Sequence, residues 1–301
     1  MKAASASRRF VLIGHPVAHS LSPVIHRAAY QELGLSHRYE LVDCPDEAAV
    51  ADVVASLRSG EIAGANVTIP WKRLALTMAD LVAPSAQRVG VANVLARGAD
   101  GAIVAHNTDV PALAEEFRRL SGSVRRVLVI GNGGSAPAVV TAAQDAGADR
   151  IALTARKFVS SVPEAEWPHA AEFAALGVTP LAWPESDARA KSRLREVIAR
   201  IDLIVNCTSA GMAGADDGEK LAEIVPWEHI PQSALAYDLI YNPVATPFLQ
   251  RARSSGLSAE NGLGMLVAQA ALAIELWLSA SPPRAVLLAA AASELAARGH
   301  R

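Results

Sequence analysis

Short apolar runs alternate with longer amphipathic stretches in the first part of the chain. The runs predicted to form strands are Phe10–Ile13, Arg38–Val42, Ile62–Val67, Val91–Leu95 and Ala102–Ala105. Between them, Ser22-Pro23 is typical of a helix start and Gly34 of a helix end, and a second helix is predicted over Asp46–Leu57. Strands that alternate with helices indicate an α/β unit with a mostly parallel sheet.

A second α/β unit is predicted to begin near Asp109. A helix over Ala112–Leu120 precedes a buried strand over Arg126–Ile130. This strand leads into the glycine-rich turn Gly131-Asn132-Gly133-Gly134, then into a helix and the strand Ile151–Leu153. A strand, a glycine turn, a helix and a strand in this order open a dinucleotide-binding fold.

The rest of the chain continues in the same manner. Helices are predicted over Glu164–Leu176 and Ala188–Arg200, strands over Asp202–Asn206 and Ala234–Leu239, and helical structure from Leu263 onward. The 301 residues exceed what a single core usually supports, which favours two domains.

Composition and charge argue against several classes of protein. The net charge of -2 comes from mixed acids and bases, with no basic stripe that would indicate a nucleic-acid partner. No apolar run reaches the ~18 residues of a membrane span, and none of signal-peptide length follows Met1–Arg9, so a cytoplasmic protein is expected. Cys44 and Cys207 are expected to be free thiols, and no metal-ligand spacing is present. A monomer and a homodimer both remain open.

The glycine turn predicts a nucleotide site. Gly131, Gly133 and Ala136 fit the pattern G-x-G-x-x-A. In this pattern the first glycine allows a sharp turn, the second allows the pyrophosphate to approach the backbone, and the small third residue allows close helix–strand packing. The helix start then presents free N–H groups to phosphate.

The residues after the next predicted strand favour NADP over NAD. An acidic residue there would bind the adenosine ribose hydroxyls of NAD, but this chain has Arg156-Lys157. A planar guanidinium suits a 2′-phosphate. The alternative interpretation of these two cations is a solvated basic loop.

Polar residues also gather beside the predicted strands of the N-terminal unit. They lie in Gly14-His15-Pro16-Val17-Ala18-His19-Ser20-Leu21-Ser22-Pro23, in Asn66-Val67-Thr68-Ile69-Pro70-Trp71-Lys72, at Asn93 and in Asn107-Thr108-Asp109. A simple fold does not require polar side chains at these positions. Because ligands of α/β sheets bind at the carboxyl ends of the strands, these segments are candidates for a substrate site.

Together with later motifs, these segments resemble the shikimate dehydrogenase family. The later motifs are Asn206-Cys207-Thr208-Ser209, Tyr237-Asp238, Tyr241 with Thr246-Pro247, and Gly262-Leu263-Gly264-Met265-Leu266-Val267-Ala268-Gln269. The motifs follow the family's order from Gly14 to Gln269, so the resemblance covers nearly the whole chain.

The resemblance implies a particular domain organisation. An N-terminal α/β substrate-binding domain with a mostly parallel sheet would comprise residues 1–109, and C-terminal helices, residues 261–301, would return to it. A Rossmann-type NADP-binding domain would comprise residues 110–260. The active site would lie in the cleft between the two domains.

The resemblance also implies an activity and its residues. Family members interconvert 3-dehydroshikimate and shikimate by hydride transfer with NADP(H), in the biosynthesis of aromatic amino acids. Lys72 would be the acid/base of this reaction, and Asp109 would be the carboxylate that keeps it charged and oriented. The implied substrate contacts are Ser20, Ser22, Thr68, Asn93, Tyr241 and Gln269. The implied cofactor contacts are Gly131, Asn132, Gly133, Gly134, Ser135, Ala136, Arg156, Lys157, Thr208, Gly262 and Met265.

Some of these residues have simpler alternative interpretations. Ser22 and Asp109 are also compatible with helix N-caps, whereas Ser20 has no such role in the predicted helix. Asn66 is expected to shape its loop and not to contact the substrate.

The C-terminal candidates have alternatives as well. Tyr241 is compatible with a buried tyrosine and Met265 with core packing. Gln269 lies in an apolar helical stretch, where an unpaired amide would be costly to bury, and this favours a ligand contact.

The chain departs from the family pattern close to the predicted substrate. Val94 stands where a threonine is usual, and His106 and Val110 flank the Asn107-Thr108-Asp109 motif in place of other residues. These departures leave a quinate or aminoshikimate dehydrogenase open. A non-catalytic NADP-binding sensor is the alternative from a different class, and the presence of Lys72 and Asp109 argues against it.

Overall fold

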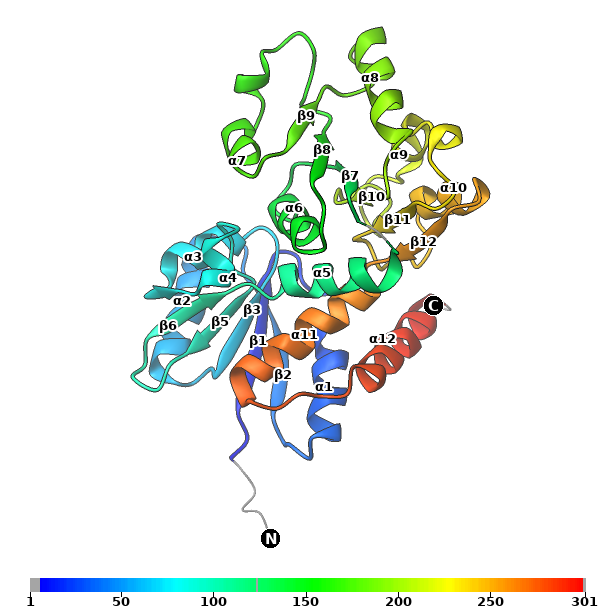
Figure 1. Ribbon diagram of the computed structural model, residues 1–301. Coiled ribbons are helices and arrows are strands. Elements are labelled where there is room, and N and C mark those ends of the chain that lie inside the picture. The colour runs from blue at the N-terminus through cyan, green and yellow to red at the C-terminus, as the bar shows by residue number, and fades with distance from the viewer. Residues whose placement is uncertain (1–5, 123, 300–301) are drawn as a thin grey trace. The chain divides into compact units, whose positions relative to one another are not determined.

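The chain forms two compact α/β units in a computed structural model that describes residues 6–122 and 124–299 (Figure 1). Unit 1 comprises residues 1–112 and 266–301, and unit 2 comprises residues 113–265. The expectation that Met1–Arg9 is not followed by a signal peptide concerns a segment of which residues 1–5 lie outside the described residues. The chain passes between the units within two helices, α5 (Asp109–Leu120) and α11 (Leu263–Leu278).

Unit 1 is built on a six-stranded sheet with the order β2-β1-β3-β5-β6-β4. Its strands are β1 (Arg9–Gly14), β2 (Arg38–Asp43), β3 (Gly64–Val67), β4 (Leu81–Val82), β5 (Val94–Arg97) and β6 (Ile103–His106). β1 pairs in parallel with β2 and β3, and β4 with β6, whereas β5 runs antiparallel to both of its neighbours. The prediction of a mostly parallel sheet is confirmed, with β5 as the exception.

The reversed direction of β5 decides which edge of the sheet its ends reach. The residue before β5, Asn93, lies at the edge where β1 and β3 end, because β5 is antiparallel to β3. The strand starts at Val94, three residues later than predicted at its N-terminal end. At the opposite edge, a tight turn over residues 98–102 joins β5 to β6 through the bond from Gly98 N to Ala102 O, of 2.8 Å.

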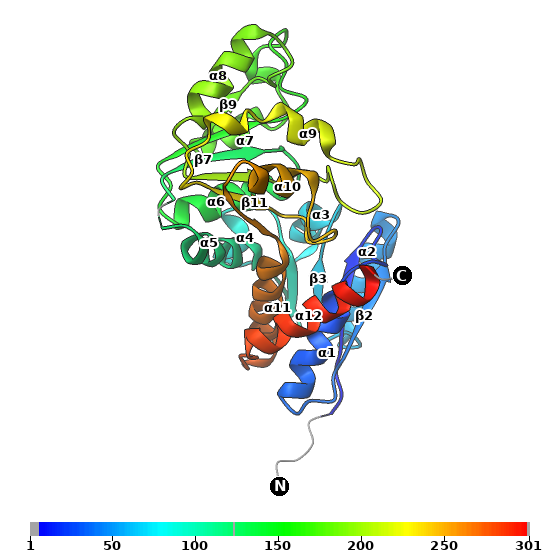
Figure 2. The same cartoon turned by 90° about the vertical axis from the view of Figure 1, so that its right-hand side faces the viewer.

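Helices cover both faces of this sheet because its side chains alternate between faces. Val11 and Ile13 of β1 belong to one core cluster together with α2 (Glu47–Ser59), α3 (Lys72–Met78) and α4 (Pro84–Gln87). Phe10 faces the other side, where its ring stacks on Trp277 of α11 at 4.9 Å. On that side α12 (Arg284–Gly299) lies against α1 (Ser22–Glu32), as both views show (Figures 1 and 2).

Unit 2 has an entirely parallel six-stranded sheet with the order β12-β11-β10-β7-β8-β9. Its strands are β7 (Arg126–Ile130), β8 (Arg150–Thr154), β9 (Thr179–Leu181), β10 (Leu203–Asn206), β11 (Leu235–Asp238) and β12 (Ser258–Asn261). Its further helices are α6 (Ala136–Asp145), α7 (Ala170–Ala175), α8 (Ala188–Ile198), α9 (Glu219–Ile224) and α10 (Pro247–Ser254), with short 3₁₀ turns at Glu164–Glu166 and Trp227–His229. The predicted dinucleotide-type order is confirmed.

The segment between β8 and α8 differs from its prediction. One helix was expected over Glu164–Leu176, but the structure has a 3₁₀ turn followed by the separate helix α7. Pro168 lies between them and has no N–H to continue a helix. His169 has a φ of 65°, outside the helical region. Among the residues that the structure describes, no helix is long and apolar enough to cross a membrane.

Candidate active site

The polar segments of unit 1 converge on one edge of its sheet. β1 ends at Gly14 and β3 at Val67 on this edge, β5 starts here after Asn93, and β6 ends here at His106. Loops from all of these strand ends therefore meet at the same place. The topology brings together segments that are far apart in the sequence, such as those of Gly14 and His106.

Lys72 and Asp109 form a direct ion pair at this edge. Lys72 is the first residue of α3, and its Nζ lies 2.6 Å from Asp109 Oδ2. The side chains are 15% and 7% exposed, respectively. Because both charges are largely removed from water, each depends on the other, and loss of either would leave an uncompensated charge.

Asn93 completes this pair. Its Nδ2 donates to Asp109 Oδ1 at 2.7 Å and to Thr108 Oγ1 at 3.0 Å, and its Oδ1 accepts from Thr108 N at 2.7 Å. Both oxygens of the Asp109 carboxylate are thus occupied, which fixes its orientation. The predicted residues Lys72, Asn93 and Asp109 lie in direct contact.

The N-cap interpretation of Asp109 is wrong. Asp109 is already the first residue of α5, and the side-chain oxygen Oδ1 of Asn107 accepts from Val110 N at 3.1 Å. Asn107 therefore performs the capping role, which leaves the Asp109 carboxylate available to Lys72.

Neither Ser20 nor Ser22 caps helix α1, so the alternative interpretation of Ser22 as an N-cap is wrong. Ser22 is the first residue of α1 and does not cap it. Instead Ser20 Oγ accepts from Ser22 N at 3.1 Å and lies 3.1 Å from Ser22 Oγ. Ser20 does not cap the helix, as expected, and its contact with Ser22 places the two hydroxyls side by side.

Gly14 and Thr68 hold the neighbouring loops together. A Cβ on Gly14 would lie 2.3 Å from Thr68 Cγ2 and 2.9 Å from Ile69 O, so only glycine fits. Thr68 N donates to Ile13 O at 2.8 Å, and the Thr68 side chain is half-buried. The predicted substrate contact Thr68 therefore lies on the same edge as Lys72.

Two further residues connect to Asn93 through a chain of hydrogen bonds. Tyr39 donates from its hydroxyl to Asn66 Oδ1 at 2.7 Å, and Asn66 Nδ2 donates to Asn93 O at 3.3 Å. The Tyr39 ring stacks on the buried His26 ring at 3.7 Å. The one sign of these contacts in the sequence was Asn66 itself, a polar residue inside a predicted apolar strand. These contacts agree with its expected structural role.

Gln269 has a partner that the sequence did not reveal. It is buried in the part of α11 that belongs to unit 1, and its Nε2 donates to Leu266 O at 2.8 Å. The argument from an unpaired buried amide is therefore wrong, and only the resemblance favours a ligand contact.

In the glycine turn of unit 2, the first glycine is closely packed and the next two glycines face open space. Gly131 has a φ of +111°, and a Cβ there would lie 2.8 Å from Thr208 Cγ2. A Cβ on Gly133 or Gly134 would meet no atom within 4 Å. Ser135 precedes α6, which begins at Ala136. The turn thus leaves open space at two glycines shortly before the helix start.

The other predicted cofactor residues are distributed over the strand ends of unit 2. Arg156 and Lys157 follow β8 and are exposed, and Arg156 Nη1 lies 3.7 Å from Asp216 Oδ2. Thr208 Oγ1 donates to Asn206 Oδ1 at 2.8 Å. A Cβ on Gly262 would lie 2.2 Å from Leu239 O, which explains this glycine by packing alone. Asn132, Tyr241 and Met265 are half-buried.

A buried carboxylate organises the loops after β10 and β11. Asp238 accepts from Asn206 Nδ2 at 3.0 Å, from Ile240 N at 3.0 Å and from Thr246 Oγ1 at 2.6 Å. Burial raises the pKa of Asp238 to about 6, although the three hydrogen bonds favour the charged form and act in the opposite direction. Through Asn206, this carboxylate also fixes Thr208.

Neither cysteine belongs to a reactive or metal-binding cluster. Both thiols are free, as predicted. Burial raises the pKa of Cys207 to about 12, and its Sγ donates to Ile130 O at 3.1 Å. Within residues 6–122 and 124–299, no group of three or more His, Cys, Asp or Glu side chains is arranged to hold a metal ion.

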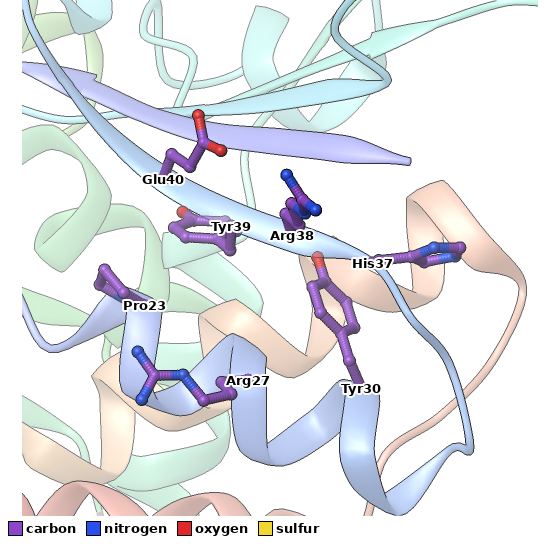
Figure 3. Close-up of a pocket in the computed structure, with 7 residues that line it drawn as sticks. All are labelled: Pro23, Arg27, Tyr30, His37, Arg38, Tyr39 and Glu40. Carbon is purple, nitrogen blue, oxygen red and sulfur yellow. The ribbon is translucent and has the colours of Figure 1, made fainter. Parts of the chain in front are cut away.

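A separate hollow on unit 1 lies between α1 and β2 (Figure 3). Its volume is about 290 Å³, and its lining residues are Pro23, Arg27, Tyr30, His37, Arg38, Tyr39 and Glu40. The Lys72–Asp109 pair does not line it. The hollow is therefore distinct from the candidate active site.

Comparisons with known proteins identify the family of the chain. The family model described as shikimate dehydrogenase substrate binding domain matches residues 12–95, and that described as shikimate 5′-dehydrogenase C-terminal domain matches residues 262–292. The shikimate dehydrogenase (NADP(+)) of Geobacter sulfurreducens is 35% identical over 298 residues, which cover 94% of this chain and 96% of that protein. The protein of the same name from Geobacillus kaustophilus is 37% identical over 279 residues, with 90% and 92% coverage.

The similarity extends to solved structures. The shikimate 5-dehydrogenase of Thermus thermophilus, determined in complex with NADP(H) and shikimate, is 32% identical, with a TM-score of 0.78. The alignment covers 95% of this chain and 99% of that one. These relatives confirm the resemblance found in the sequence. The chain belongs to the shikimate dehydrogenase family.

Proposed function

We propose that the chain is an NADP-dependent shikimate dehydrogenase that reversibly reduces 3-dehydroshikimate to shikimate. The observation that carries this proposal is the ion pair of the half-buried Lys72 and the buried Asp109, held by Asn93 at the edge where the polar loops of unit 1 meet. Residues 1–109 and 261–301 would bind the substrate, and residues 110–260 would bind NADP. The activity is that of the relatives named shikimate dehydrogenase (NADP(+)).

The residues of unit 2 fit a dinucleotide phosphate. Open space next to Gly133 and Gly134 allows a pyrophosphate to reach the backbone N–H groups that precede α6. Arg156 and Lys157 provide exposed positive charge after β8, where the 2′-phosphate of NADP would lie. When bound, NADP(H) supplies the hydride for reduction and accepts it in the reverse direction.

Lys72 supplies the proton that the reduction also requires. As negative charge develops on the substrate's carbonyl oxygen, the ammonium group stabilises it and transfers a proton to form the hydroxyl. Asp109 holds the ammonium in place, and Asn93 prevents the carboxylate from rotating away. In the reverse direction the neutral amine accepts the hydroxyl proton.

The hydroxyl and amide groups on the same edge suit a polyhydroxylated carboxylic acid. Ser20 and Ser22 would bind its carboxylate, and Thr68 and Asn93 would bind ring hydroxyls, with Tyr241 and Gln269 as further contacts. A site that pairs with substrate hydroxyls rejects analogues that lack them by roughly 10⁴-fold, because its own polar groups are then left without partners.

The test is NADP⁺ reduction with shikimate, quinate and aminoshikimate in parallel, and with NAD⁺ in place of NADP⁺. We expect the highest kcat/KM for shikimate with NADP⁺. A higher value for quinate or aminoshikimate would contradict the proposed substrate. Nucleotide binding without turnover of any of the three would indicate a sensor, and a preference for NAD⁺ would contradict the proposed cofactor.

Substitution of Lys72 tests the proposed mechanism. Lys72→Met should lower kcat by about 10²-fold or more, the usual contribution of a general acid, and leave the Kd of NADP⁺ unchanged. Lys220→Met is the matched control, since Lys220 is an exposed lysine of α9. Near-normal turnover in the Lys72 variant would exclude the assigned role.

A further inference from the structure

The cation expected to select NADP already has an acidic neighbour. Arg156 lies directly after β8, and its side chain is 77% exposed. Its Nη1 lies 3.7 Å from Oδ2 of Asp216, which belongs to the loop between β10 and α9. The guanidinium that would bind a 2′-phosphate thus faces a carboxylate of the same unit.

The backbone of its own loop fixes this carboxylate. Gly211 N donates to Asp216 O at 2.7 Å, and Gly218 N donates to Asp216 Oδ1 at 3.1 Å. Gly218 has a φ of +82°, and a Cβ there would lie 2.8 Å from Gly211 Cα, so the two ends of the loop are in close contact. One carboxylate oxygen is therefore occupied by the backbone, and the other is left for Arg156.

We propose that Asp216 is a specificity-determining residue that limits the preference for NADP over NAD. This inference rests on the proposed NADP-dependent function. A 2′-phosphate carries a charge of about -1.5 to -2 at neutral pH, so it must displace Asp216 from Arg156 and is repelled by it. The 2′-hydroxyl of NAD carries no charge, and Asp216 affects its binding much less.

The experiment measures binding of two small probes, 2′,5′-ADP and 5′-AMP, by titration calorimetry on the full chain at low ionic strength. The variant Asp216→Asn removes the charge and keeps the oxygen that accepts from Gly218 N. We expect it to bind 2′,5′-ADP about two- to five-fold more tightly, as the usual strength of an exposed ion pair implies, and to bind 5′-AMP unchanged. The gain should shrink as salt is added, because added ions screen exposed charges.

Two further variants isolate the contact. Asp217→Asn makes the same charge change one residue away, where the carboxylate accepts from Glu219 N at 3.1 Å, and it should give a smaller gain. In an Arg156→Gln background the effect of Asp216→Asn should fall, because most of it acts through the shared guanidinium. The melting temperature of each variant reports whether it is folded.

Several results would overturn the inference. Weaker or unchanged binding of 2′,5′-ADP by Asp216→Asn would do so, and so would an equal gain for 5′-AMP or for Asp217→Asn. The proposed cofactor is judged separately, by whether the unmodified chain prefers 2′,5′-ADP to 5′-AMP. If the unmodified chain does not prefer 2′,5′-ADP, the response of the Asp216→Asn variant still shows whether the Asp216 carboxylate weakens binding of a 2′-phosphate.

Discussion

Asp109 and Asp238 are both buried carboxylates, but they have different kinds of partner. Asp109 contacts the ammonium of Lys72, whereas Asp238 receives hydrogen bonds only from the uncharged groups of Asn206, Ile240 and Thr246. A buried charge without a counter-ion is costly, and part of that cost is relieved by taking up a proton. The two residues therefore contribute differently to stability.

The raised pKa of Asp238 predicts a loss of stability as the pH rises. The folded protein holds this proton more tightly than the unfolded chain, since burial raises the pKa from 3.8 to about 6. The resulting stabilisation is complete below pH ~3.8 and is lost as the pH rises through about 6, with a total of about 3 kcal/mol. Asp238→Asn should remove this part of the pH dependence and be at least as stable at pH 7.

Urea unfolding between pH 4 and pH 7 measures this contribution as the difference between the variant and the unmodified chain. Taking this difference cancels the other titrating groups. Asp217→Asn, a change at an exposed acid, serves as the control and should leave the pH dependence nearly unchanged. An Asp238→Asn curve parallel to that of the unmodified chain would show that the carboxyl titrates normally.

The residue pairs of the site differ in how far the sequence could predict them. The family resemblance implied that Lys72 and Asp109 belong together, and the structure shows the ion pair. The chain from Tyr39 through Asn66 to Asn93 could not be predicted in this way, because its members meet only once β1, β2, β3 and β5 are aligned. The roles of these residues in catalysis remain predictions.

At the scale of elements, two glycines of the turn before α6 have different roles, one structural and one expected to be functional. Gly131 is required by its backbone conformation and by the nearby Thr208, whereas Gly133 has open space where a side chain would lie. The sequence pattern predicted a sharp turn at Gly131 and close approach of a phosphate at Gly133, and the structure adds the contacts that explain the first of these roles.

Alanine substitutions test this distinction. Gly133→Ala should leave the free energy of unfolding within about 0.5 kcal/mol of the unmodified value. Its Kd for NADP⁺ should rise about ten-fold or more, because the methyl group would occupy the phosphate's space. Gly131→Ala should instead destabilise the protein. Urea unfolding and calorimetry measure the two effects, and unchanged NADP⁺ affinity in Gly133→Ala would place the phosphate elsewhere.

An element marked by a continuous apolar run was predicted better than short elements without one. The strand at Arg126–Ile130 has its predicted bounds, since a buried apolar run after a helix has few alternatives. The short helix α3 and the two-residue strand β4 were not predicted, because their sequences carry too few positions to show a period. Val91 and Ala92 were assigned to a strand because they are apolar, but they lie in a buried loop.

At the scale of the whole molecule, each unit has a hydrophobic core of its own. The cluster of unit 2 is formed by residues between Leu128 and Ala259, and one cluster of unit 1 by residues between Val11 and Ala105. Unit 1 is completed by α11 and α12 from the far end of the sequence, with Trp277 Nε1 donating to Leu95 O at 3.2 Å. We therefore expect that the stability of unit 1 and nucleotide binding by unit 2 can be changed separately.

Two adjacent leucines of α12 test this independence. Leu287 is fully buried, whereas Leu288 is 42% exposed. Leu287→Ala should cost about 2–5 kcal/mol of unfolding free energy in unit 1, and Leu288→Ala much less. Below the unfolding transition, calorimetry should find the affinity of unit 2 for 2′,5′-ADP unchanged in both variants. Weakened probe binding in folded Leu287→Ala would show that the two units are energetically coupled.

The turn over residues 98–102 offers a practical use of the reversed strand β5. It joins β5 to β6 at the edge of the sheet opposite to Lys72 and Asp109. Asp100 at its tip is exposed, and the strands on either side are held by their own pairing. A fluorophore or a short affinity tag placed there would report on the folding of unit 1 or immobilise the protein without touching the reacting groups.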